Sequence, residues 1–154
     1  DGDEDLGRAC DLFSECGLER ACAVTEATLG RAQLERALKG SRSEREGLLR
    51  LARASFLRSF KRMEGVGYRK GQINACAQLA EVHFTLAGEL GDSPAEEHCR
   101  ELPLEQLKEI MLAKEWTEKQ RDLQRGSSEP VHFIESDAAL LNLVCIMLAT
   151  GEQG

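Results

Sequence analysis

Cysteines are the most reactive side chains of this chain, because thiols form disulfides, bind metals and act as nucleophiles. Three of the six recur at six-residue steps, at Cys10, Cys16 and Cys22. A six-residue step turns about 240° around a helix, and zinc-binding pairs need two to four intervening residues. This spacing argues against a metal site. No signal peptide or glycosylation sequon accompanies the cysteines, so we expect reduced, mostly buried thiols in an intracellular protein.

Three histidines lie far apart in the sequence and outside any metal or nucleophile motif. His83 falls on an apolar helical stripe, which favours a hydrogen-bonded histidine in the core. The run from Glu96 to Cys99 places acids, an imidazole and a thiol in a row, but adjacent helical residues point about 100° apart and cannot pair. Gly65 and Gly67 lack the third glycine and the preceding strand of a nucleotide-binding turn. The sequence therefore predicts no catalytic residues, no cofactor and no metal.

Charge is distributed unevenly along the 154 residues, which hold 20 basic and 27 acidic side chains and carry a formal net charge of -7. Residues 31–70 contain 12 Lys and Arg and only 4 acids, so the remaining residues hold 8 basic and 23 acidic side chains. A basic block in an acidic chain favours an acidic protein as ligand. The negative overall charge and the shortage of aromatic residues near the block disfavour nucleic acid.

The basic block includes a predicted helix whose cations lie opposite the side that carries Phe56 and Phe60. We expect five cations and two groove residues to contact the partner: Arg50, Arg53, Arg58, Lys61, Arg62, Tyr68 and His83. A run of charge is usually a solvated face, so an ordinary surface is the alternative interpretation. The four acids within residues 1–5 could also fold back onto this face and compete with the partner.

Glycine, proline and capping residues divide the chain into the helices that must position these side chains. Gly17 and Gly40 end the first two helices, and two overlapping Ser-x-x-Glu capping boxes at residues 41–46 begin the third. The predicted helices cover residues 3–17, 18–40, 43–64, 68–90, 94–102, 104–125 and 137–150. We expect the polar tail of residues 115–125 to project into solvent.

The apolar residues of these helices recur three or four positions apart, as in amphipathic helices that pack as antiparallel hairpins. On the third helix they are Leu49, Ala52, Phe56, Phe60 and Met63. The longest apolar stretch, residues 138–149, is about a dozen residues long, whereas a bilayer needs ~20. It is therefore predicted to be a buried helix rather than a membrane anchor.

Residues 76–83 read Cys-x-x-Leu-Ala-x-x-His where one repeat family has W-x-x-L-G-x-x-Y, and Gly91 and Asp92 follow at a turn. Ala95, Cys99 and Leu102 stand near the packing positions of the next helix. On these residues the middle of the chain, roughly 47–102, resembles a tetratricopeptide-type helical repeat. Its Trp and Tyr positions are filled by Cys and His, and its first helix is longer than a ~34-residue unit allows. The resemblance implies a right-handed stack of hairpins whose concave face holds a partner's peptide or helix.

Together these features predict a single all-α domain over residues 1–154. It is either a set of stacked antiparallel helical hairpins, as in a tetratricopeptide-like solenoid fragment, or an irregular helical bundle of six to seven helices. We expect residues 1–5 to be an acidic flexible end, 126–136 a loop and 137–150 a buried terminal helix. The predicted function is a non-enzymatic adaptor that binds a peptide or helix of an acidic partner protein. The alternative is a structural or autoinhibitory domain that packs within a larger chain or complex or self-associates.

Overall fold

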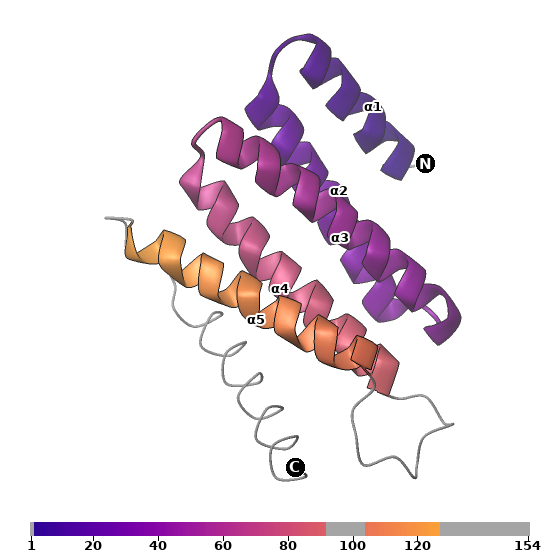
Figure 1. The fold of residues 1–154 in the computed structure, drawn as a ribbon. Coiled ribbons are helices and arrows are strands. Elements are labelled where there is room, and N and C mark those ends of the chain that lie inside the picture. The colour runs from indigo at the N-terminus through magenta and orange to yellow at the C-terminus, as the bar shows by residue number, and fades with distance from the viewer. Residues whose placement is uncertain (1, 92–103, 127–154) are drawn as a thin grey trace.

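A computed structural model of the chain describes residues 2–91 and 104–126, which form five packed α-helices with no strand among them. Consecutive helices lie side by side, and short turns reverse the chain between the first four (Figure 1). Their bounds are α1 Gly2–Glu15, α2 Glu19–Lys39, α3 Arg42–Gly65, α4 Arg69–Gly91 and α5 Leu104–Arg125. None of these helices is both long and apolar enough to span a membrane.

The predicted all-α class is confirmed as a helical bundle, but the described residues hold five helices rather than six to seven. The helices predicted at residues 94–102 and 137–150, and the loop predicted at 126–136 beyond Gly126, lie outside the described residues. The ends of α3, α4 and α5 fall within one or two residues of the predicted ends, because glycine turns and capping residues mark them.

The same turn closes the α1–α2 hairpin and the α3–α4 hairpin. Gly17 and Gly67 adopt φ values of 69° and 68°, the left-handed conformation that glycine adopts without a steric penalty. In each turn the next residue donates its backbone N–H to a carbonyl five residues earlier, from Leu18 to Phe13 at 2.7 Å and from Tyr68 to Met63 at 2.8 Å. This pattern is a Schellman motif, which satisfies the last carbonyls of a helix.

The main hydrophobic core lies between α2, α3 and α4. Its buried residues are Leu34, Ala37, Leu49, Ala52, Phe56, Leu79, Val82 and Leu86. The apolar stripe predicted on α3 is confirmed, since all five of its residues are buried. The Phe56 ring lies against Gly30, where an added Cβ would come within 2.9 Å of the ring. Glycine at this position therefore lets α2 and α3 approach closely.

A second cluster joins α3 and α4 to α5, through Phe60, Ala75 and Cys76 with Trp116 and Leu123 around them. The tail of α5 is thus packed against the bundle instead of projecting into solvent, and its Thr117, Gln120 and Gln124 are buried. Short or flexible polar side chains allow this close packing, and the Thr117 hydroxyl donates to the Ala113 carbonyl of its own helix at 2.9 Å.

Three acidic residues at the start of the chain lie in the first turn of α1, which begins at Gly2, whereas Asp1 lies outside the described residues. Asp3, Glu4 and Asp5 stand where the helix dipole favours negative charge. α1 packs on α2 alone among the described helices, and Cys10 is its one buried residue. α1 is therefore the helix with the fewest tertiary contacts.

Candidate functional site

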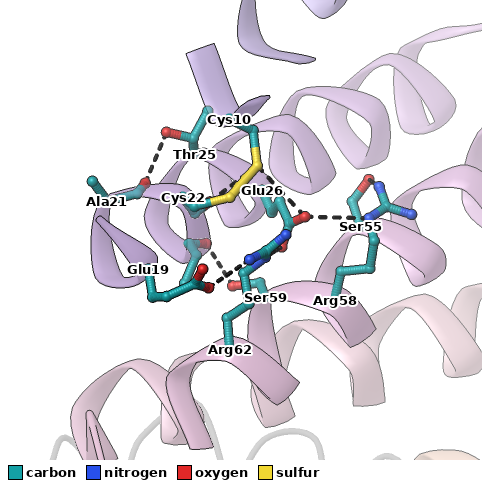
Figure 2. The surroundings of a disulfide bond; sticks show 11 residues. Cys10, Glu19, Ala21, Cys22, Thr25, Glu26, Ser55, Arg58, Ser59 and Arg62 are labelled. Atoms are coloured by element: carbon teal, nitrogen blue, oxygen red, sulfur yellow. Dashed lines mark hydrogen bonds and ion pairs between the residues drawn. A yellow bond between two sulfur atoms is a disulfide. The ribbon is translucent and has the colours of Figure 1, made fainter. Parts of the chain in front are cut away.

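The α1–α2 turn brings Cys10 opposite Cys22, and the two form a disulfide with a Cα–Cα distance of 4.6 Å (Figure 2). The sequence predicts reduced thiols, and for this pair that prediction is wrong. A six-residue step turns about 240° only within one helix, whereas here the chain reverses at Gly17 and places Cys10 and Cys22 face to face. The disulfide also removes the support that reduced cysteines gave to an intracellular location.

The other described cysteines are free thiols in opposite environments. Cys16 is exposed at the end of α1, and Cys76 is fully buried in α4. Burial raises the pKa of Cys76 to about 12, so its reactive thiolate is scarce at neutral pH.

Glu26 lies one helical turn after Cys22 and faces the disulfide. Its Oε1 is 3.6 Å from Cys10 Sγ, and only 5% of the residue is exposed. Burial raises the pKa of Glu26 above its usual value, and this effect outweighs the opposing influence of two nearby arginines, Arg62 and Arg58. A buried carboxyl group beside sulfur was not predicted, because an acid in an amphipathic helix is ordinarily assigned to the solvent side.

Arg58 and Arg62 of α3 point toward this carboxylate from the facing helix (Figure 2). Arg58 Nε lies 3.4 Å from Glu26 Oε1, and Arg62 Nε lies 3.2 Å from Glu26 Oε2. Arg62 also donates through Nη1 to Glu19 Oε2 at 2.5 Å. The hydrogen bond to Glu19, followed by the charge of Glu26, raises the pKa of Arg62 against the effect of its partial burial.

Two serines of α3 continue the polar contact between α2 and α3. Ser55 donates to Gln33 Oε1 at 2.9 Å, and Ser59 donates to the Ala23 carbonyl at 2.7 Å. We call this set, with the groups around Glu26, the polar seam: Glu19, Glu26, Gln33, Ser55, Arg58, Ser59 and Arg62. All its buried polar groups are paired with one another or with backbone, which stabilises one fixed register of the two helices.

The cations predicted to bind a partner have different surroundings in the structure. Arg58 and Arg62 belong to the polar seam, and Arg50 pairs with Glu46 one turn earlier on its own helix at 2.7 Å. Arg53 lies 3.9 Å from Glu109 of α5. Lys61 is exposed and forms no ion pair with the described residues. Most of the basic face is thus neutralised within the bundle.

The two predicted groove residues are also engaged internally. The Arg20 guanidinium lies over the Tyr68 ring at 3.9 Å from its centroid, and this cation–π contact joins the two glycine turns. His83 is 3% exposed, and its Nδ1 lies 2.5 Å from Glu109 Oε2. The interpretation of His83 as a hydrogen-bonded core histidine is confirmed. A partner cannot reach it in this arrangement, and its acidic neighbour on α5 was not predicted.

Comparison of the chain with protein-family models, with curated proteins and with solved structures found no match. The tetratricopeptide resemblance is therefore not supported by any recognised relative.

Two surface grooves lie at opposite ends of the α2–α3 pair. The larger, of about 860 Å³, lies beside the glycine turns and is lined mainly by apolar groups, among them Phe13, Leu18, Val24 and Val66. The smaller, of about 580 Å³, lies where α2 passes into α3. Its lining residues are Arg36, Lys39, Gly40, Ser43, Glu44, Gly47, Leu48 and Leu51. This smaller groove, which we call the Leu51 groove, combines exposed leucine with basic side chains.

One of the cations that line the Leu51 groove already forms an ion pair with an acid of α1. Asp3 Oδ2 accepts a hydrogen bond from Arg36 Nη1 at 2.7 Å, although the two residues are 33 positions apart. One acid at the start of the chain thus contacts a cation of the basic block, but this cation lies on α2 and not on the predicted face of α3, because α1 packs on α2 alone among the described helices.

Proposed function

We propose that this protein is a non-enzymatic interaction domain that binds an acidic amphipathic helix of a partner protein in the Leu51 groove. The observation that supports this most directly is the make-up of the groove. Leu51 is 54% exposed, and Leu48 beside it is packed partly against the core, so both offer apolar contact from a rigid base. Arg36 and Lys39 stand at the same groove and complement acidic side chains that flank an apolar stripe.

The contact between Asp3 and Arg36 supports the choice of an acidic ligand, because a helix of this chain already places a carboxylate on that guanidinium. The exposed side chain of Lys61, which forms no ion pair with the described residues, adds positive potential on α3. The tetratricopeptide resemblance favours the same class of function, since such hairpin stacks bind peptides. The protein is proposed to have no catalytic role and to meet neither nucleic acid nor a membrane.

The direct test uses a fluorescently labelled synthetic helix with leucines at i, i+3, i+4 and i+7 and Asp or Glu elsewhere. A second peptide in which Lys replaces every acid is the probe for charge. We expect fluorescence anisotropy to show binding of the acidic peptide only, weakened at least about fivefold by Lys39→Glu and by Leu51→Asp.

Lys114→Glu is the matched control, because Lys114 is a similarly exposed lysine on α5, away from the groove. Equal loss of binding in Lys114→Glu and Lys39→Glu would show that overall charge alone attracts the peptide. Unchanged binding in both Lys39→Glu and Leu51→Asp would reject the Leu51 groove as the binding site.

A second candidate function, a structural subunit within a larger chain or complex, is favoured by an apolar stripe on α5. Leu104, Leu107 and Met111 are 67%, 42% and 55% exposed and lie on one side of that helix. Sedimentation velocity separates the two proposals. A dimer or larger assembly that dissociates in the Met111→Glu variant would favour the structural role. A monomer that binds the acidic peptide would favour the interaction domain.

A further inference from the structure

Cys10, Cys22 and Glu26 form the one cluster of metal-ligating side chains among the described residues. The two sulfurs and a carboxylate oxygen all lie within 4.8 Å of one another. We propose that, once its disulfide is reduced, this cluster binds one Zn²⁺ ion. Zinc binding and the disulfide are mutually exclusive, because both use the sulfur atoms of Cys10 and Cys22. This inference is independent of the proposed peptide binding, which uses the opposite end of the α2–α3 pair.

The ligand set suits zinc in number and in kind. Cys22 and Glu26 are four residues apart on α2, so both project from one side of that helix, and Cys10 approaches from α1. Thiolate sulfur with one carboxylate oxygen is a donor set that Zn²⁺ accepts in tetrahedral geometry. Three protein ligands leave the fourth position to water, and Cys10, at 9% exposed, lies at the edge of the cluster where water can reach.

The charges around the cluster are compatible with an added cation. Glu19 and Glu26 balance Arg58 and Arg62, and a Zn²⁺ ion with two thiolates adds no net charge to that set. Glu26 Oε1 faces Cys10 and is the ligating oxygen in this proposal, while Oε2 keeps its contact with Arg62 at 3.2 Å. Arg62 would then orient the carboxylate, as residues behind metal ligands commonly do.

The sulfur atoms must separate for zinc to bind between them. Two thiolates on one zinc, each about 2.3 Å from the metal, lie about 3.8 Å apart. α1 can supply this movement because it packs on α2 alone among the described helices. A trialkylphosphine reduces the disulfide and water supplies the oxygen and the two protons, so the products are a phosphine oxide and two thiols. Zinc binding then releases the two thiol protons.

The test uses the whole chain, reduced with a trialkylphosphine under argon, desalted and titrated with Co²⁺ as a visible probe. We expect one equivalent of Co²⁺ to give thiolate charge-transfer bands and the d–d bands of a tetrahedral site, and one equivalent of Zn²⁺ to remove them. The oxidised protein is the closest control, because it has the same residues but no thiolate pair, and it should give no bands.

Variants identify the ligands. Cys10→Ser and Cys22→Ser should lose the charge-transfer bands, and Glu26→Gln should weaken Co²⁺ binding at least about tenfold. A triple variant, Cys16→Ser, Cys99→Ser and Cys145→Ser, should keep the full spectrum. Circular dichroism checks that each variant is folded, and Cys10→Ala is a second test of the α1 ligand if Cys10→Ser does not fold. Absence of bands in the reduced protein, or bands that persist in Cys10→Ser and Cys10→Ala, would overturn the proposal.

Discussion

The α1–α2 and α3–α4 hairpins have glycine turns of the same type but are stabilised by different forces. In α3–α4, buried apolar side chains such as Phe56, Leu79 and Val82 fill the space against neighbouring helices. In α1–α2, the one buried residue of α1 is Cys10, and a covalent bond replaces a hydrophobic interface. A local turn signal therefore determines where the chain reverses. The interior of each hairpin determines whether its stability depends on hydrophobic burial or on redox state.

Truncating Phe56 should have the largest effect, because it removes apolar contacts from the main hydrophobic core. Its ring is 1% exposed and fills the space above Gly30, so Phe56→Ala should lower the free energy of unfolding by about 3 to 5 kcal/mol. Urea titration followed by circular dichroism measures it. The matched control, Phe13→Ala on the partly exposed α1, should cost clearly less. Equal losses would show that both hairpins depend on hydrophobic burial.

Reducing the disulfide tests the covalent side. Cys10 and Cys22 close a loop with a sequence separation of 12, and loss of such a crosslink costs about 3 kcal/mol in the chain-entropy estimate. Because α1 has few other contacts, we expect reductant to increase amide hydrogen exchange in α1 while α3 and α4 stay protected. Cys76→Ser leaves the disulfide intact and should keep α1 protected without reductant. Uniform exchange across all helices on reduction would contradict this division.

The buried carboxyl group of Glu26, beside the disulfide, should make stability depend on pH. Burial raises its pKa, so the folded chain binds this proton more tightly than the unfolded chain does. Its contribution to stability is therefore fully present below the unfolded pKa and is lost as pH rises through the folded pKa. The unfolding free energy of the wild type minus that of Glu26→Gln should fall from about pH 4 upward. Glu105→Gln, an exposed change on α5, is the control, and a difference that rises with pH would refute the sign.

The contact between Asp3 and Arg36 should have the smallest effect. Both side chains are partly exposed, and such pairs contribute less than about 1 kcal/mol. Asp3→Asn should leave the melting temperature almost unchanged but raise the affinity of the acidic peptide, by no more than about fivefold. Asp11→Asn is the matched control on α1. If Asp3→Asn leaves the affinity unaltered, α1 does not compete for the Leu51 groove.

Much of the fold could be predicted from local signals, because glycine turns, capping residues and apolar spacing act within a few residues. The candidate site could not, since it depends on how helices face each other. One signal was present: Cys10 and Cys22 lie seven and five residues from Gly17, and positions at similar distances from a hairpin turn face each other. Hydropathy indicates solvent exposure for Glu26, Thr117, Gln120 and Gln124, and this is wrong. These polar residues are buried because partners satisfy their polar groups or because their size allows close packing.

The buried thiol of Cys76 can serve as a probe of how often the helices around it separate. With a pKa of about 12, only about one in 10⁵ of these thiols is ionised at pH 7, and the side chain is fully covered. Alkylating reagents therefore modify it only while the surrounding helices are separated. In a chain with Cys16, Cys99 and Cys145 replaced by serine and the disulfide intact, mass spectrometry of this single alkylation would follow the population of the open state at low reagent concentration, and the rate of opening once alkylation outpaces reclosing.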